Sequence, residues 1–253
     1  MSSERVRSTA DGAIGRITLN APERLNAVDP DMCAAVVEAV RTFDADPSVR
    51  VIALTGEGRG FCSGAPLTAD GAQMGVLEAG AELVRTIMAA RTPVVALVHG
   101  VAAGIGVPMA LACDYVLAAD DAPFVLAFSR IGLMPDGGST ALVAASVGRA
   151  RAMRLALTGE KLDGATAADW GLVAESVPAD GFAERAEALL ATFAAGATLA
   201  LAETTAAVNA ASVDVEAALA REDTGQRMLG GTEDHREGAA AFTQKRRPDF
   251  RAR

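Results

Sequence analysis

The segment VRVIALTGEGRGFCSGA (residues 49–65) joins a short apolar run to a glycine-rich turn. Val49–Thr55 has the length and composition of one buried strand, and Gly56 ends it. The glycines that follow allow a tight turn and a close approach of the backbone to a ligand. The segment therefore predicts a buried strand whose end presents backbone N–H groups to a cavity. An ordinary glycine-rich turn is the alternative.

The segment PVVALVHGVAAGIG (residues 93–106) repeats this arrangement. Pro93–Val98 predicts a strand that Gly100 ends, and the next turn can open a helix, whose first N–H groups are unpaired and favour negative charge. Its glycine spacing does not match a dinucleotide-binding motif. Close helix–strand packing through Gly104 and Gly106 is the alternative. Two such turns predict a two-donor oxyanion hole for a thioester enolate or a tetrahedral oxyanion.

The pattern of predicted secondary structure changes near residues 176–180. Before this break strands and helices alternate, which indicates an α/β architecture, and after it the sequence is helical. We therefore expect residues 1–178 to form the core with the active site and residues 179–253 to form a helical region for oligomerisation. Further strands are predicted at Ala13–Leu19 and Asp114–Ala118. The predicted helices are Pro30–Phe43 (with Asp29 as N-cap), Gly75–Ala90, Gly181–Ala194, Leu199–Ala210, Val213–Leu229 and Glu233–Lys245.

Asp136 is the candidate acid/base. The segment GLMPDGG (residues 132–138) places its carboxylate between apolar residues and a flexible turn, where burial would raise its pKa toward a useful range. The alternative is that Asp136 is a turn residue or caps a helix that begins near Ser139. His99 is interpreted as a structural turn histidine. The chain has no Gly-x-Ser-x-Gly motif, which argues against a serine hydrolase.

The composition narrows the class of protein. The chain has 253 residues, 51 % hydrophobic and 22 % charged, with a net charge of −9, which argues against a general nucleic-acid binder. No signal-peptide pattern and no membrane-spanning apolar run is apparent, so we predict a cytoplasmic protein that binds no membrane. Three widely spaced cysteines and two histidines predict neither a disulfide framework nor a metal site.

Six segments in chain order resemble the crotonase (enoyl-CoA hydratase/isomerase) superfamily, over nearly the whole chain. They are residues 22–27 (PERLNA), 60–67, 93–114, 156–159 (ALTG), 168–173 (ADWGLV) and 241–246 (AFTQKR). The resemblance implies a spiral core of ββα turns and a C-terminal helical trimerisation region, with trimers that often pair into hexamers. It also implies an acyl-CoA thioester as the substrate, with coenzyme A as part of that substrate rather than a permanent cofactor.

The resemblance also implies roles for individual residues. Ala65 and Ile105 match the two oxyanion-hole positions. The residues that match the coenzyme A site are Leu25, Ala27, Ser63, Ala65, Leu67, Ile105, Phe242 and Lys245. The last two match a C-terminal region that often meets the adenine or 3′-phosphate end, sometimes across a subunit interface. The segment between Leu67 and Gly75 is expected to shape the acyl pocket.

Three positions depart from the family pattern. Hydratases of the family use two glutamates to activate water, and this chain has Pro108 and Phe128 at those places. Pro66 replaces the usual acidic residue after Ala65. The segments 124–138 and 148–153 resemble instead the branch with enoyl-CoA isomerases and 1,2-epoxyphenylacetyl-CoA isomerase, in which a carboxylate near Asp136 is the acid/base.

The sequence thus predicts an enoyl-CoA isomerase in which Asp136 moves a proton while Ala65 and Ile105 hold a dienolate. The alternatives, in order, are a ring-epoxide CoA isomerase, a plain enoyl-CoA hydratase and a non-catalytic acyl-CoA binder. Thioester hydrolysis would need an activated water, and no second group that could activate it is apparent.

Overall fold

The computed structural model describes residues 5–68, 71–72 and 74–253. The segment between Leu67 and Gly75, for which the sequence predicts a role in shaping the acyl pocket, therefore lies partly outside the described residues. The first four residues, on which the prediction of no signal peptide partly rests, also lie outside them.

The larger sheet has six strands. Its first two strands pair antiparallel, and each later pair is parallel. The order is β1 (Val6–Asp11), β2 (Ile14–Leu19), β3 (Val51–Gly56), β7 (Val94–Val98), β9 (Tyr115–Ala119) and β12 (Glu175–Val177). The four strands predicted from the sequence are β2, β3, β7 and β9. β1 was not predicted because it is mostly exposed and polar, without an apolar run.

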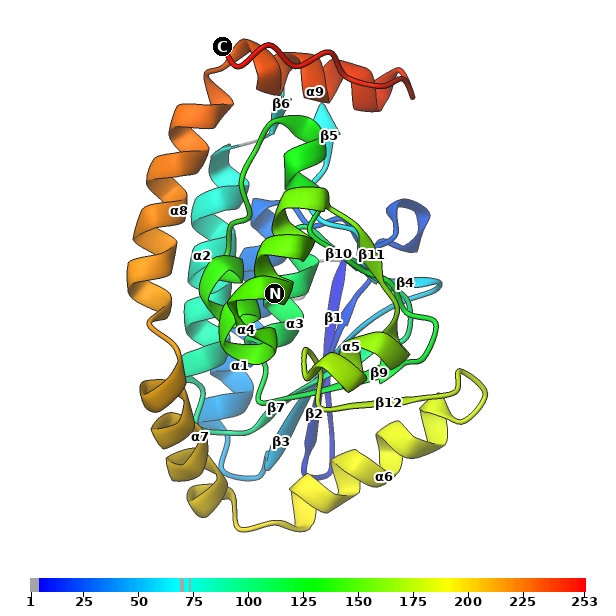
Figure 1. The fold of residues 1–253 in the computed structure, drawn as a ribbon. Coiled ribbons are helices and arrows are strands. Elements are labelled where there is room, and N and C mark those ends of the chain that lie inside the picture. The colour runs from blue at the N-terminus through cyan, green and yellow to red at the C-terminus, as the bar shows by residue number, and fades with distance from the viewer. Residues whose placement is uncertain (1–4, 69–70, 73) are drawn as a thin grey trace.

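After each central strand of the larger sheet, the chain forms a strand of a second, four-stranded sheet. Its order is β11 (Lys161–Leu162), β10 (Phe124–Val125), β8 (Val101–Ala103) and β4 (Gly60–Cys62). The chain passes from β3 to β4, from β7 to β8 and from β9 to β10, and a helix follows each pair (Figure 1). These helices are α2 (Met74–Ala89), α3 (Gly106–Leu111) and α4 (Ser139–Thr158). This repeated strand–strand–helix order is the expected spiral of ββα turns.

Alternation of side chains along the central strands builds two apolar layers. Successive residues of a strand point to opposite faces of the sheet. Ile52 and Leu54 of β3 belong to the main core, whereas Val51 and Ala53 pack with Leu189 and Leu190 of α6 (Phe182–Ala195). Both faces of these parallel strands are therefore covered, which explains why their sequences read as continuous apolar runs.

The remaining elements connect and cover the sheets. α1 begins where the sequence predicts, because the Asp29 carboxylate accepts a hydrogen bond from the Met32 N–H at 3.0 Å and Pro30 is at N1. These elements are η1 (Pro22–Arg24), α1 (Pro30–Ala45), η2 (Ala127–Ile131), α5 (Gly164–Trp170) and the short antiparallel pair β5 (Leu67–Thr68) and β6 (Gly71–Ala72).

The four helices predicted after the break are confirmed, with small shifts at their ends. They are α6, α7 (Thr198–Ser212), α8 (Val215–Gly230) and α9 (Glu233–Thr243). α9 stops before the predicted Lys245, which has a left-handed φ of 53°. α8 lies alongside α2, and α9 crosses over β5 and β6 (Figure 1). The C-terminal helices therefore return to the core of their own chain.

Within the described part of the chain, no single helix is long and apolar enough to cross a membrane. One pair, Phe182–Ala195 with Thr198–Ser212, reaches the required length and composition together but is bent by 103°.

Candidate active site

The two glycine-rich turns of the sequence meet at the ends of adjacent parallel strands. β4 pairs with β8, and the turns leave these strands in the same direction. A Cβ atom on Gly64 would lie 3.2 Å from the Ala103 carbonyl oxygen, and one on Gly104 would lie 3.3 Å from the Gly64 Cα. Gly64 also has a φ of +107°, which side chains rarely adopt. Glycine at these positions therefore lets the two turns touch through their backbones.

Ala65 and Ile105 directly follow the two touching glycines, Gly64 and Gly104. Their backbone nitrogens are therefore bonded to neighbouring residues. Neither N–H donates a hydrogen bond to another residue that the structure describes. Ile105 is the N-cap of α3, where helix N–H groups are unpaired and attract negative charge. Ala65 is exposed. Two N–H groups on touching turns, without an acceptor among the described residues, are what the predicted oxyanion hole would need.

A third turn, at residues 25–27, is joined to the first glycine turn. The Ser63 N–H donates to the Leu25 carbonyl at 3.0 Å, and the Val28 N–H donates to the Gly64 carbonyl at 2.8 Å. The Ser63 hydroxyl donates to the Arg24 carbonyl at 3.0 Å. Leu25, Ala27, Ser63 and Ala65, which the resemblance assigns to the coenzyme A site, are thus brought together.

Asn26 holds this junction and was not identified from the sequence. Its side chain is fully buried. The amide nitrogen donates to the carbonyls of Glu57 and Gly60, at 2.9 and 2.7 Å, and the amide oxygen accepts from the Ala21 N–H at 2.8 Å. Its φ of 56° suits asparagine, which tolerates the left-handed region. The available signal was its place in the segment PERLNA (residues 22–27), which resembles the family pattern.

The Asp136 turn packs against the second glycine turn. A Cβ atom on Gly137 would lie 2.5 Å from Cδ1 of Ile105 and 3.0 Å from Cγ of Pro108. The Phe128 ring comes within 3.9 Å of a Cβ placed on Gly104. Pro108 and Phe128, which stand where family hydratases carry glutamates, are therefore both at this site, and both are buried.

Two residues of α8 surround the Asp136 turn, and neither was identified from the sequence. The Gln226 amide donates to Oδ2 of Asp136 at 2.9 Å and to the Met134 carbonyl at 2.7 Å. Glu222 is 1 % exposed and accepts hydrogen bonds from the N–H groups of Gly138 and Thr140. The only signal for them was their spacing of four residues, which places both on one face of a helix.

The environment of Asp136 favours its protonated form. Burial, and secondarily the negative charge of Glu222, raises the pKa of Asp136 to about 7, against the opposing effect of the hydrogen bond from Gln226. Burial also raises the pKa of Glu222, while its bonds to Thr140 and Gly138 oppose that rise. The Asp136 side chain does not cap the helix that follows, since Gly138 is the N-cap without a side-chain bond. The helix-cap alternative for Asp136 is therefore wrong.

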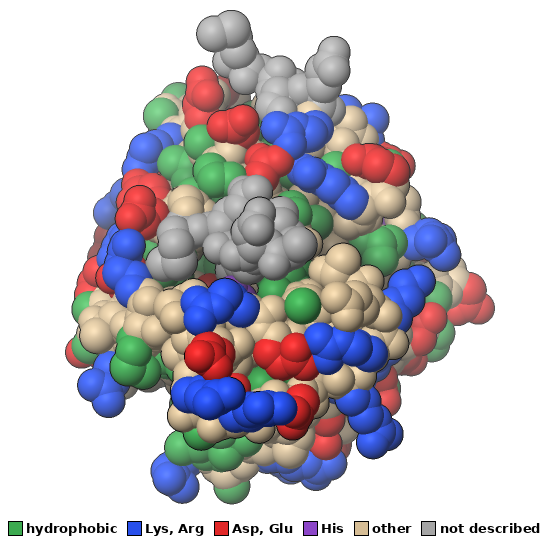
Figure 2. Space-filling model, turned by 90° about the horizontal axis from the view of Figure 1, so that it is seen from above, with side chains coloured by type: hydrophobic (Ala, Val, Ile, Leu, Met, Phe, Trp, Pro, Cys, Tyr) green, Lys and Arg blue, Asp and Glu red, His purple; other side chains and the backbone are tan. Residues whose placement is uncertain are grey.

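The C-terminal candidates lie on α9 and just after it. α9 packs against β5, which contains Leu67, and against η2. Phe242 is 65 % exposed, and Lys245 is also exposed. Seen from above, this end of the molecule shows basic and acidic side chains side by side (Figure 2). Three arginines there pair with acids: Arg246 with Glu237, Arg251 with Asp249, and Arg253 with Glu233.

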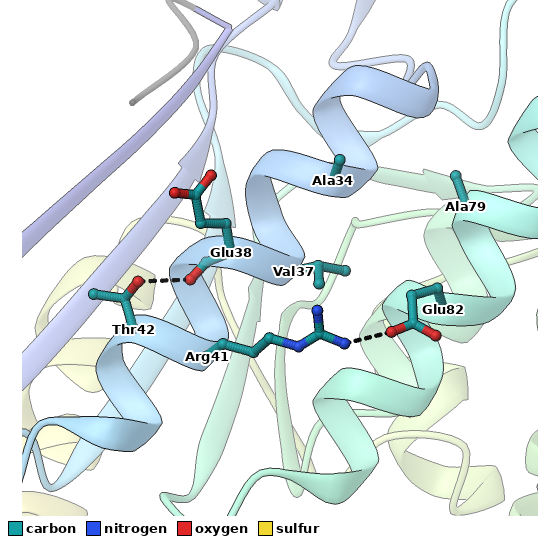
Figure 3. A pocket seen from close by; sticks show the side chains of 7 residues that line it. All are labelled: Ala34, Val37, Glu38, Arg41, Thr42, Ala79 and Glu82. Carbon is teal, nitrogen blue, oxygen red and sulfur yellow. Dashed lines mark hydrogen bonds and ion pairs between the residues drawn. The ribbon is translucent and has the colours of Figure 1, made fainter.

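Other features lie apart from this site. His99 contacts the Gly58 carbonyl at 2.9 Å and the Phe182 ring, as a structural turn histidine would. A surface groove of about 520 Å³ runs between α1 and α2, floored by small side chains and crossed by the Arg41–Glu82 ion pair (Figure 3). The three cysteines are free and buried. The described residues include no group of three or more His, Cys, Asp or Glu that could hold a metal ion.

Comparison with known proteins agrees with this geometry. The model of the family described as enoyl-CoA hydratase/isomerase matches residues 9–253. A 1,2-epoxyphenylacetyl-CoA isomerase of Escherichia coli K12 is 38 % identical over 257 residues, covering 98 % of each chain. A probable enoyl-CoA hydratase of Rhodobacter capsulatus is 41 % identical over 260 residues, covering 100 % of each.

A solved structure shares the fold. The crystal structure of an enoyl-CoA hydratase from Mycobacterium avium subsp. paratuberculosis K-10 superposes with a TM-score of 0.93 at 43 % sequence identity, and the match covers 98 % of each chain. The expected crotonase fold is thereby confirmed. From the family match and these relatives, the chain belongs to the enoyl-CoA hydratase/isomerase family of the crotonase superfamily.

Proposed function

We propose that this protein is an enoyl-CoA isomerase that uses Asp136 as its single acid/base. One observation carries the proposal. The Asp136 turn packs beside Ile105, whereas the two positions at which family hydratases carry glutamates hold Pro108 and Phe128. A single carboxylate can remove and return a proton, but it cannot share the work of activating a water molecule with a second one.

The proposed reaction moves one proton within the acyl chain. The thioester carbonyl of a 3-enoyl-CoA accepts hydrogen bonds from the N–H groups of Ala65 and Ile105. Asp136 breaks the C–H bond at C2 and takes the proton, and the electron pair spreads into a dienolate held by the two N–H groups. Asp136 then returns the proton to C4, which leaves a conjugated 2-enoyl thioester. Each oxyanion-hole donor contributes roughly 3 kcal/mol to stabilising the transition state.

The environment of Asp136 suits both halves of this cycle. A carboxylate with a pKa raised to about 7 is a stronger base than an ordinary aspartate and can both accept and return a proton near neutral pH. The buried Phe128 and Pro108 exclude water from the same side of the site. Exclusion of water suppresses hydration of the product.

A ring-epoxide isomerase is the second candidate. It is favoured by the relative from Escherichia coli, which is named 1,2-epoxyphenylacetyl-CoA isomerase and matches 98 % of this chain. The same donors and the same carboxylate would serve, with a wider acyl pocket. A plain hydratase, the name that other relatives carry, has less support from the site because Pro108 and Phe128 cannot transfer a proton. A non-catalytic acyl-CoA binder is the remaining alternative.

The test compares Asp136→Asn with the parent on three coenzyme A thioesters. We expect Asp136→Asn to lower turnover of a linear 3-enoyl-CoA by about 10²- to 10⁴-fold while acyl-CoA binding persists. The exposed α5 variant Asp169→Asn is the matched control and should behave as the parent. Equal turnover by Asp136→Asn and the parent would overturn the role of Asp136.

The other two substrates separate the alternatives. Faster turnover of a ring-epoxide CoA thioester than of the linear 3-enoyl-CoA would favour the second candidate. Appreciable addition of water to crotonyl-CoA would favour a hydratase. Tight acyl-CoA binding without turnover, unchanged in Asp136→Ala, would favour a non-catalytic binder.

The remaining assignments are also proposals. We infer that Leu25, Ala27, Ser63 and Leu67 line the coenzyme A site, and that Phe242 and Lys245 meet its adenine or 3′-phosphate end. We also infer that residues 179–253 mediate a homotrimer, with a dimer of trimers as the larger form, and that the protein is cytoplasmic. The family match and the adjacency of α9 and β5 support the coenzyme A assignments.

A further inference from the structure

We propose that Glu222 and Gln226 of α8 are positioning residues for Asp136, in which Gln226 fixes the orientation of the carboxylate and Glu222 holds its turn and opposes its negative charge. This inference rests on the proposed function, because it assigns Asp136 as the acid/base. Both residues are almost fully buried, 1 % exposed for Glu222 and 4 % for Gln226. Their spacing of four residues puts them on the same face of α8.

Gln226 ties the carboxylate to the backbone of its own turn. Its amide nitrogen carries two hydrogens and uses them on Oδ2 of Asp136 and on the Met134 carbonyl. The two acceptors are two residues apart, so the amide fixes the side chain relative to the turn. Among the described residues none donates to Oδ1 of Asp136, which leaves this oxygen to exchange the substrate proton.

Glu222 holds the other end of the same turn. Its Oε2 accepts from the Gly138 N–H at 2.7 Å, and its Oε1 accepts from the Thr140 N–H at 2.9 Å and the Thr140 hydroxyl at 2.6 Å. These donors lie at the N-terminus of α4, where a negative charge is stabilised. Glu222 therefore takes the place of the missing side-chain cap of α4, with both of its oxygens acting as acceptors.

The charged groups around the Asp136 turn come from several elements. Glu222 of α8 bonds the turn directly, and Arg149 of α4 lines a separate cavity with Pro135 and Thr140. Glu222 lines a 290 Å³ cavity between α2 and α8 that reaches Gly137, and the other charged residues around the cavity are Glu78, Arg85 and Asp223. Arg85 pairs with Glu216, and Arg227 pairs with both Glu78 and Asp223. α3 carries no charged side chain. On the α9 side, His235 contacts the Ile131 carbonyl, and Asp234, whose backbone lies beside Gly132, accepts from the N–H groups of Arg251 and Ala252.

The two residues have opposite effects on the proton of Asp136. The Glu222 charge favours the protonated form, whereas the Gln226 hydrogen bond favours the ionised form. Removing the charge should therefore lower the pH at which Asp136 titrates, and removing the hydrogen bond should raise it. If Glu222 and Gln226 had a purely structural role, removing either would lower stability or turnover, but it would not shift the titration of Asp136 in opposite directions.

The test uses Glu222→Gln and Gln226→Met in the full-length protein. The titration of Asp136 is followed by carboxyl ¹³C NMR after labelling of aspartate, and its signal is assigned by its loss in Asp136→Asn. We expect the midpoint to fall by about one pH unit in Glu222→Gln and to rise in Gln226→Met. The acid limb of turnover against pH should move in the same directions. Asp223→Asn, which removes an acidic charge of α8 already paired with Arg227, is the matched control and should leave the midpoint unchanged.

The outcomes separate this inference from the proposed function. Unchanged midpoints, or midpoints that move in the same direction, would overturn the inference even if the parent is an active isomerase. Opposite shifts in a protein without isomerase turnover would keep the inference and overturn the function. If Glu222→Gln does not fold, Gln226→Met decides alone, since a midpoint that stays or falls in that variant contradicts the proposal.

Discussion

Asp136 and Asn26 are two polar side chains of the site that have opposite effects on the stability of the folded state. Asp136 is a partly buried carboxyl group without a cationic partner among the described residues, and a neighbouring carboxyl group makes its ionisation still less favourable. Asn26 is the reverse, a buried polar side chain whose hydrogen bonds all meet backbone groups. The first is expected to weaken the folded state at neutral pH and the second to strengthen it.

Replacing Asp136 should therefore stabilise the protein at high pH. The folded-state pKa of about 7 lies above the ordinary value of 3.8, so the folded state binds more protons between these values. Stability is then lost as the pH rises from about 4 to about 7, and the loss persists above 7. We expect Asp136→Asn to raise the free energy of unfolding by on the order of 2 kcal/mol at pH 8 and by less at pH 5. Urea unfolding at both pH values measures it, and an equal effect at both would contradict the assignment.

Asn26→Ala should be among the most damaging single changes near the site. It leaves the Ala21 N–H and the carbonyls of Glu57 and Gly60 without their side-chain partner in a buried place. We expect a loss of about 3 kcal/mol or more. Asn26→Asp keeps the acceptor but not the donors, so thermal unfolding should place it below the parent as well. A loss below about 1 kcal/mol in Asn26→Ala would refute the supporting role.

At the scale of elements, the helices position the residues of the candidate site as much as the glycine-rich turns do. α3 starts directly from the second glycine turn and packs against β4, so the position of Ile105 depends on this contact. α8 comes from the C-terminal region and still contributes Glu222 and Gln226 to the Asp136 turn. The boundary near residue 178 therefore separates a mixed strand–helix sequence from a helical one. The residues that surround Asp136 come from both sides of it.

Gly106→Ala tests the contact between α3 and β4. Alanine normally stabilises a helix relative to glycine, by roughly 1 kcal/mol. A Cβ on Gly106, however, would overlap the carbonyl oxygen of Cys62 and lie 2.9 Å from its Cβ. We expect destabilisation by about 2 to 4 kcal/mol and loss of turnover, because the Ile105 N–H must move.

Gly75→Ala is the matched control in the first turn of α2. Among the described atoms, a Cβ there would meet Cγ of Pro30 alone, at an ordinary 3.4 Å. Thermal unfolding of both variants should show Gly75→Ala at or above the parent. Gly106→Ala as stable as Gly75→Ala would show that the backbone contact is not restrictive.

At the scale of the whole molecule, the C-terminal helices leave apolar surface outside. Leu199 and Val208 of α7 are 73 % and 57 % exposed, and among the described residues of that helix only Ala202 is buried. We propose that these side chains belong to the subunit interface of the homotrimer proposed above. Sedimentation should therefore give a mass three or six times that of the 25.7 kDa chain. A monomer at micromolar concentration would contradict the proposed trimer.

The sequence by itself located four strands, six helices and the family. Short β-like runs located β2, β3, β7 and β9, of which β3 and β7 were ended by glycines, because the length and period of an apolar run are local properties. The helical texture after residue 178 located α6 to α9 for the same reason. The glycine-rich turns and the missing glutamates at Pro108 and Phe128 pointed to an oxyanion site with one carboxylate, and the motifs in order identified the superfamily that the family match confirms.

Only the tertiary structure decided what surrounds the site. Hydrogen bonds between residues 26 and 60, or between residues 136 and 226, join residues that no local pattern connects. The same holds for the charge of Glu222, which acts on Asp136 only because α8 packs against α4 and α2. Burial and nearby charge set a pKa, and both depend on which segments the fold brings together. The sequence supplied the carboxylate, and the packing of α8 set its proton affinity.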